Sequence, residues 1–277
     1  MRGHAVEDDQ MLQQVADFRA EAEELQTLLA TLKDQDWQRP TSFKSWTVND
    51  VVQHLHASVL MASASVAGAE PFARFRDEIQ TARENGMTRL EETRQRLGDL
   101  TAGRLLERWH QQMVALCDRL SGLPADTRLK WAGPDMGVRM FTTARQMETW
   151  AHGQSIYDLV RKPRQPTGRL RNIAELGVRT YGWTFFNRAI EQPGPAPFVG
   201  LRGPSGEVWE WNPPAGESNV TGSALDFCQV VTQVRNVADT ALQVTGEPAR
   251  RWMNIAQCFA GPPEDPPLPG ARLIPAS

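Results

Sequence analysis

Two residues that could share one metal ion lie in the segment RQMETWAHG, residues 145 to 153. The flanking sequence has a helical pattern, and side chains four residues apart lie on one helix face, one turn apart. Glu148 and His152 could therefore bind the same ion. They do not form the H-E-x-x-H motif of metalloproteases, so a third ligand must come from another helix. Spacing alone leaves the choice open, because such pairs are common on helices and are usually solvated.

The third ligand has to come from the other histidines of the chain. The five histidines are at positions 4, 54, 56, 110 and 152. His54 lies in a predicted helix whose start is marked by Thr47 as the cap and by Asp50 three residues later. It falls near the apolar stripe of this helix, whereas His56 is rotated from it by about 200° and is predicted on the outer face. His54 is therefore the preferred third ligand.

Two imidazoles and one carboxylate would make a site with a particular chemistry. A set of His54, Glu148 and His152 leaves a coordination position free for water or substrate, which is typical of catalytic rather than structural metal sites. Nitrogen and oxygen donors of this kind are accepted by zinc, nickel, iron and manganese. The residues alone therefore indicate a divalent metal without choosing among these four.

The elements that must position these residues follow from the hydrophobic pattern of the 277 residues. Helical periodicity continues to about residue 160. The segment RKPRQPTGR, residues 161 to 169, contains Pro and Gly and no apolar residue, which is typical of a linker. Beyond it, GLRGPSGEVWEW predicts a β-hairpin, and short strands alternate with helices. We therefore predict an α+β protein with an all-α domain at residues 1–163, a small α/β domain at 164–262 and a Pro-rich tail at 263–277.

Charge and composition disfavour several classes of protein. A net charge of −3 is typical neither of DNA-binding nor of RNA-binding proteins, which carry clustered positive charge. The sequence has no apolar run long enough for a membrane span and no signal peptide pattern. The three cysteines, Cys117, Cys228 and Cys258, have no zinc-knuckle spacing and are predicted to be reduced interior thiols. We expect a cytoplasmic protein with a small-molecule substrate and no nucleic-acid or membrane partner; a homodimer stays open.

Three segments of the chain resemble the mycothiol-dependent maleylpyruvate isomerase family of the DinB/YfiT-like superfamily. They read SWTVNDVVQHLHAS, WAGPDMGVRMFTTARQMETWAHGQSIYD and GSALDFCQVVTQVRNVADTALQVTG, and they are most similar to an uncharacterised, largely actinobacterial branch. The resemblance implies a DinB-like four-helix bundle followed by a small domain similar to sterol-carrier folds. It also implies that His54, Glu148 and His152 bind a divalent metal, usually Zn²⁺.

The resemblance further implies a reaction that uses a low-molecular-weight thiol such as mycothiol or glutathione. The family's isomerases add the thiol to a double bond and its transferases join the thiol to an electrophile, so a small acidic or electrophilic substrate is expected. The chemistry suits the predicted site, because a thiolate is the nucleophile and a metal with an open position can lower the pKa of a bound thiol. A thiol-independent hydrolase or lyase and a non-catalytic, metal-stabilised binding protein are the alternatives.

Four further residues are candidates for the surroundings of the site. Arg235 falls where the isomerase family carries an Arg that faces the site, which implies a catalytic role; the alternative is a surface Arg. Arg145 could support the Glu148 carboxylate or could form an ordinary salt bridge on the bundle surface. Trp46 and Trp131 could line a pocket.

Overall fold

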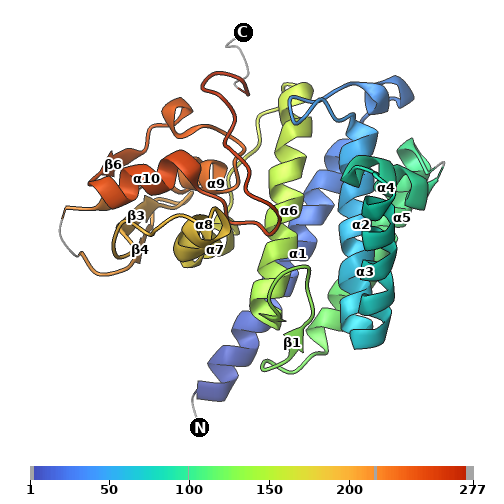
Figure 1. The fold of residues 1–277 in the computed structure, drawn as a ribbon, viewed down its shortest axis with the longest axis horizontal. Coiled ribbons are helices and arrows are strands. Elements are labelled where there is room, and N and C mark those ends of the chain that lie inside the picture. The colour runs from blue at the N-terminus through green and yellow to red at the C-terminus, as the bar shows by residue number, and fades with distance from the viewer. Residues whose placement is uncertain (1–2, 99, 215–216, 273–277) are drawn as a thin grey trace. The chain divides into compact units, whose positions relative to one another are not determined.

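The computed structural model describes residues 3–98, 100–214 and 217–272. The chain divides into two compact units, Met1–Leu159 and Val160–Ser277, and each is described here by itself. The division falls beside the segment 161–169 in which the sequence predicts a linker. The described residues form a helix-rich α+β fold (Figure 1). The domain limits at residues 163 and 262 stay predictions.

The first unit is built from helices that pack side by side (Figure 1). Helix α1 packs against α5 and α6, and α2 packs against the same two helices, so the four enclose a common core. The shorter helices α3 and α4 cover α2 on another side. The helices are α1 (Gly3–Leu29), α2 (Val48–Ala67), α3 (Ala69–Glu84), α4 (Arg89–Leu97), α5 (Ala102–Ser121) and α6 (Val138–Leu159), with a 3-10 turn η1 at Asp34–Gln38.

A small antiparallel hairpin joins α5 to α6. Its strands are β1 (Arg128–Leu129) and β2 (Met136–Gly137). The Ser65 hydroxyl near the end of α2 donates a hydrogen bond to the backbone oxygen of Lys130 at 2.6 Å, which holds the loop of the hairpin against the helices. Trp131 follows in this loop and is buried.

The start of α2 is fixed by local and long-range hydrogen bonds. The Thr47 hydroxyl accepts from the Asp50 backbone N–H at 3.1 Å, and the Asp50 carboxylate accepts from the Thr47 backbone N–H at 2.9 Å. This is the capping box that the sequence predicts. Arg94 of α4 donates two further bonds to the same carboxylate, at 2.7 and 2.8 Å. The fork holds the first turn of α2, one turn before His54, against α4.

Asp50→Ala is expected to lower the stability of the first unit by about 2–3 kcal/mol, because it removes both the cap and the charge-assisted fork. That loss corresponds to a decrease in melting temperature of roughly 5–10 °C for a unit of this size. Thermal melts would measure it. Glu70→Ala is the matched control, since its ion pair with Arg74 is exposed and should contribute almost nothing. Equal melting temperatures for the two variants would contradict the role assigned to Asp50.

The second unit is a four-stranded sheet with helices. The strand order is β4-β3-β5-β6; β3 pairs antiparallel with β4 and parallel with β5, and β5 pairs antiparallel with β6. The predicted hairpin is β3–β4, with Leu201 opposite Trp209. Helix α7 packs closely on α9, because a Cβ at Gly177 would come within 2.8 Å of Val231. The elements are α7 (Leu170–Arg179), α8 (Tyr181–Asn187), β3 (Phe198–Arg202), β4 (Val208–Trp211), β5 (Asn219–Ser223), α9 (Ala224–Val231), η2 (Val237–Asp239), β6 (Gln243–Thr245) and α10 (Glu247–Ile255).

The described part of the Pro-rich segment, residues 263–272, is hydrogen-bonded to the second unit. Arg188 donates to Asp265 at 2.8 Å, Asn236 donates to the backbone oxygen of Pro267 at 2.8 Å, and the Gly270 backbone N–H donates to the Asp239 carboxylate at 2.8 Å. These residues therefore lie along the second unit rather than extending from it. Within the described ranges, none of the helices has the length and hydropathy that a bilayer-spanning segment requires.

Candidate metal centre

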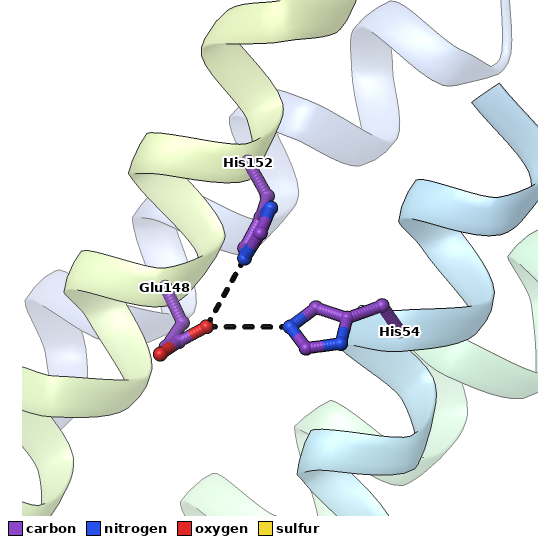
Figure 2. Close-up of side chains that lie close together, drawn as sticks. All are labelled: His54, Glu148 and His152. Atoms are coloured by element: carbon purple, nitrogen blue, oxygen red, sulfur yellow. Dashed lines mark hydrogen bonds and ion pairs between the residues drawn. The ribbon is translucent and has the colours of Figure 1, made fainter. Parts of the chain in front are cut away.

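Three predicted ligands meet between two helices of the first unit. His54 comes from α2, and Glu148 and His152 come from consecutive turns of α6; the three side chains point toward one another (Figure 2). Glu148 Oε2 lies 3.4 Å from His54 Nε2 and 3.3 Å from His152 Nε2. One donor atom from each residue lies within 4.8 Å of the other two. The three form a group that could hold a metal ion.

These separations suit metal ligands better than direct hydrogen bonds. A charge-assisted N–H···O bond is usually about 2.7–2.9 Å long, which is shorter than either contact. Two ligands at about 2.0–2.1 Å from a tetrahedral ion lie about 3.3 Å apart, close to the observed values. The side chains are also only partly exposed, by 18, 21 and 14% for His54, Glu148 and His152, so an ion here would be largely shielded from solvent.

The protonation states of the site favour metal binding. Burial and, to a smaller extent, the neighbouring His152 together lower the pKa of His54 to about 4, against the opposing effect of Glu148. Burial alone would raise the pKa of Glu148, but the close polar contacts with His152 and His54 outweigh it and hold that pKa well below its ordinary value. At neutral pH the site therefore offers a neutral His54 and an ionised Glu148, the forms that ligate metals.

The Nδ1 atom of His54 is buried and has no hydrogen-bond partner among the described residues. Metal-binding histidines usually donate their second ring nitrogen to an acceptor, which fixes the ring. At His54, contacts with aromatic side chains would fix the ring instead of such a hydrogen bond. The Trp46 ring lies 5.4 Å from the ring of His54 and 6.3 Å from that of His152, and Phe43 lies 4.9 Å from His152. Trp46 thus contacts both imidazoles, and Phe43 contacts that of His152.

A tight turn presents these two aromatic residues. The Trp46 backbone N–H donates to the Phe43 backbone oxygen at 2.9 Å, and the two residues between them, Lys44 and Ser45, have φ angles of 51° and 57°. Left-handed backbone at two successive non-glycine residues costs free energy, on the order of 1–3 kcal/mol each. The turn therefore has a conformational cost, and it brings both Phe43 and Trp46 into contact with the ring of His152.

Arg145 does not lie on the bundle surface, which was the alternative that the sequence left open. Its side chain is buried, its guanidinium carbon lies 3.6 Å from the centre of the Trp131 ring, and its Nη1 donates to Ser58 at 3.2 Å. Trp131 thus contacts Arg145 rather than the three ligands. Burial lowers the pKa of Arg145, and the Glu148 carboxylate, one turn further along α6, partly opposes this effect through its charge.

Two other predictions about individual residues need correction or comment. His56 is only 4% exposed, so its predicted position on an outer face is wrong. The reason is that α2 is surrounded by α5, α6 and the α3–α4 pair and has no outer face at this point. Arg235 is 7% exposed, which excludes the alternative of a surface Arg. It belongs to the second unit, and its catalytic role stays a prediction.

The three cysteines are buried and unpaired with one another. Burial raises the pKa of Cys117 to about 12 and raises that of Cys228 well above its ordinary value, where the nearby Cys258 adds to the effect. Thiols of this kind are protonated at neutral pH and are poor nucleophiles.

Native protein is therefore expected to react slowly with Ellman's reagent, because all three thiols are buried and the raised pKa values of Cys117 and Cys228 keep those two protonated. The absorbance of the released thiolate would measure the rate. Protein in guanidinium chloride is the control and should release three equivalents rapidly, one for each cysteine. A cysteine that reacts within seconds in the native protein would reopen the question of a nucleophile supplied by the chain.

Comparison with known proteins places this geometry in a family. The model of the mycothiol maleylpyruvate isomerase N-terminal domain matches residues 18–157, which include all three candidate ligands. The chain belongs to this family. Two uncharacterized proteins of Mycobacterium tuberculosis, from strains CDC 1551/Oshkosh and ATCC 25618/H37Rv, are each 38% identical to it over 249 residues, which cover 90% of this chain and 96% of the relative.

Solved structures of a mycothiol-dependent maleylpyruvate isomerase and of a mutant of that enzyme are also similar to the chain. Each has a TM-score of 0.48, covers 79% of this chain and 88% of its own, and is 13 or 12% identical. The family membership rests on the domain match and on the mycobacterial relatives, and the site described above rests on its own geometry.

Proposed function

We propose that the protein is a divalent-metal-dependent enzyme that uses a low-molecular-weight thiol to act on a small acidic or electrophilic substrate. The observation that carries this proposal is the convergence of His54, Glu148 and His152 from two helices, with donor atoms within 4.8 Å of one another. Membership of the mycothiol maleylpyruvate isomerase family supports the thiol. The reaction would be an isomerisation or the transfer of the thiol to the substrate, and Zn²⁺ is the preferred metal.

Each residue of the site has a role in this proposal. Bound by the three ligands, a divalent ion would lower the pKa of a thiol or polarise a carbonyl oxygen. His54 offers a neutral imidazole and Glu148 supplies the one negative charge of the ligand set. Trp46, which contacts both histidines, and Phe43, which contacts His152, would restrict the access of water to the two rings. Because the three cysteines are buried, they are poorly placed to act as the nucleophile, which would instead be the small thiol.

The finer features of the fold are proposed on the same grounds. We assign α1, α2, α5 and α6 to a DinB-like four-helix bundle within residues 1–163, and residues 164–262 to a sterol-carrier-like domain followed by the Pro-rich segment 263–277. The mutual packing of the four helices and the mixed sheet of the second unit support these assignments. Free, buried cysteines are typical of a reducing compartment, which supports a cytoplasmic location.

Metal analysis of the purified protein, followed by a panel of thiols, tests the proposed function. Mycothiol, glutathione and cysteine would each be offered together with maleylpyruvate as the electrophile. We expect one equivalent of a divalent metal and turnover that requires both metal and thiol. Turnover without thiol would favour the hydrolase or lyase alternative, and absence of bound metal under metal-replete conditions would overturn the proposal.

Arg235 is proposed to hold an acidic group of the substrate. Arg235→Gln is then expected to raise KM for an acidic substrate by about tenfold or more, since a charge-assisted hydrogen bond contributes roughly 1.5–3 kcal/mol. Its metal content should not change. Steady-state kinetics with metal analysis would measure both. A variant with unchanged KM for the acidic substrate would remove Arg235 from the site.

A further inference from the structure

Arg145 is a buried positive charge close to the candidate metal centre. It lies on α6, one turn before Glu148, and is 4% exposed. Trp131 covers one face of its guanidinium, and Ser58 accepts one of its hydrogen bonds. Its Nε atom is buried without a hydrogen-bond partner in the described part of the chain, and no carboxylate of those residues forms an ion pair with it. Its charge is therefore compensated mainly by Glu148 from a distance.

A charge buried in this way affects whatever binds beside it, because electrostatic interactions are strong where water is excluded. Burial lowers the pKa of Arg145 to about 10, so the guanidinium stays protonated at neutral pH. Arg89, another cation near the site, donates to the buried Glu92 carboxylate at 2.9 Å, and Arg96 donates to the same carboxylate at 2.7 Å. Unlike Arg89, Arg145 contacts no carboxylate among the described residues.

The balance of charge changes when a divalent ion is present. Without an ion, the charges of Glu148 and Arg145 cancel. With a divalent ion on the three ligands, the two charges of the ion, the negative charge of Glu148 and the positive charge of Arg145 sum to a net charge of two. Without Arg145 the net charge would be one. Such an excess favours an anion over a neutral molecule in the open coordination position.

We infer that Arg145 sets the charge of the metal centre, so that the loaded site selects an anionic exchangeable ligand, such as a thiolate or a carboxylate, over a neutral one. This inference rests on the proposed function, because it requires that an ion binds at His54, Glu148 and His152. Arg145 acts here through its charge and not by contact with the ligand, so it is a positioning residue.

Removal of Arg145 should change the metal affinity in one direction if the residue acts through its charge, and in the other direction if its role is purely structural. An outer residue that only orients a ligand weakens metal binding when it is removed, commonly by about 10–100-fold. A nearby positive charge instead repels the ion, so its removal should strengthen metal binding. The same removal should weaken the binding of anions to the loaded site. Loosened packing would not produce tighter metal binding together with weaker anion binding.

Cobalt-loaded protein provides the test, because the visible spectrum of Co²⁺ reports its ligands. Wild type would be compared with Arg145→Met, which removes the charge, Arg145→Lys, which keeps it, and Arg119→Met, which removes an exposed charge of α5. Calorimetry would give the affinity for Co²⁺. Titrations with azide and with imidazole would then give the affinities of an anionic and a neutral ligand for each loaded protein.

For Arg145→Met we expect Co²⁺ binding to be tighter, and the preference for azide over imidazole to fall by about tenfold or more. Arg145→Lys and Arg119→Met should keep the wild-type preference. Unchanged or weaker Co²⁺ binding by Arg145→Met, or an unchanged preference, would overturn the inference while leaving the proposed function intact. Failure of the wild type to bind Co²⁺ would overturn both. If Arg145→Met does not fold, Arg145→Gln provides the same comparison.

Discussion

His54→Ala is expected to give a folded protein that holds little metal and has no activity. His54 is the one candidate ligand supplied by α2, whereas Glu148 and His152 share α6. A bound ion would therefore connect two helices, and its loss would remove that connection. Ligand-linked stabilisation is about 2.7 kcal/mol at a hundredfold excess of metal over Kd. The apolar core of the helices should keep the apo protein folded, unlike a zinc finger.

Thermal melts of wild type and His54→Ala, with and without chelator, would measure this effect, and elemental analysis would give the metal content. His110→Ala is the matched control, because it removes a half-buried histidine from α5, outside the group of three. The variant at His54 should melt like chelated wild type. Full metal content in His54→Ala would remove it from the ligand set. A wild-type melt that chelator leaves unchanged, although the metal is stripped, would contradict the connection between the helices.

Chelator-treated protein is expected to lose most of its stability as the pH falls from about 6.5 towards 4. Burial lowers the pKa of both His54 and His56 from the ordinary 6.5 to about 4, so the folded state binds fewer protons than the unfolded state in this range. The contribution of the two neutral histidines to the free energy of unfolding is therefore fully present above pH 6.5. It is lost as the pH falls through the pKa values that they have in the folded state. Each histidine contributes roughly 3 kcal/mol, a large part of the stability of an ordinary domain.

Urea denaturation at a series of pH values would measure this loss of stability. The variant His56→Gln would show how much of the loss comes from each of the two histidines. His56 Nδ1 is buried and has no hydrogen-bond partner among the described residues, so its protonation in place is costly. The variant should lose about half as much stability between pH 6.5 and 4 as the wild type does. A wild-type stability that is constant over this range would show that both histidines titrate normally in the folded protein.

Local rules predicted which three side chains come together, because the signals for them are local. The capping box at Thr47 and Asp50 fixes where α2 begins, and therefore which residues one turn later face α6. The spacing of Glu148 and His152 gives their common face directly. In the second unit the GPSG turn predicted the β3–β4 hairpin. The parallel pairing of β5 with β3 had no comparable signal, because it joins segments separated by a whole strand and its loops.

The errors arose where several elements meet. A helix with one buried and one solvent-exposed face would expose His56, but α2 is enclosed by α5, α6 and the α3–α4 pair. Arg145 is buried because Trp131 and Ser58, from a hairpin and another helix, cover it. The turn at Lys44 and Ser45 also had no signal, since left-handed backbone is usually occupied by Gly or Asn. The packing of distant segments decides these three features, and no short stretch of sequence encodes it.

The distance of 94 residues between His54 and Glu148 has a consequence for the chain during its synthesis. A ribosome that adds about 5–20 residues per second needs roughly 5–20 s to proceed from one to the other. Throughout that interval α2 exists without α6, and for part of it without α5, two of the helices against which it packs in the finished fold. Until α6 emerges, the apolar side chains of α2 must be kept from non-native contacts in the nascent chain. The element that completes the candidate centre is also the one that ends this exposure.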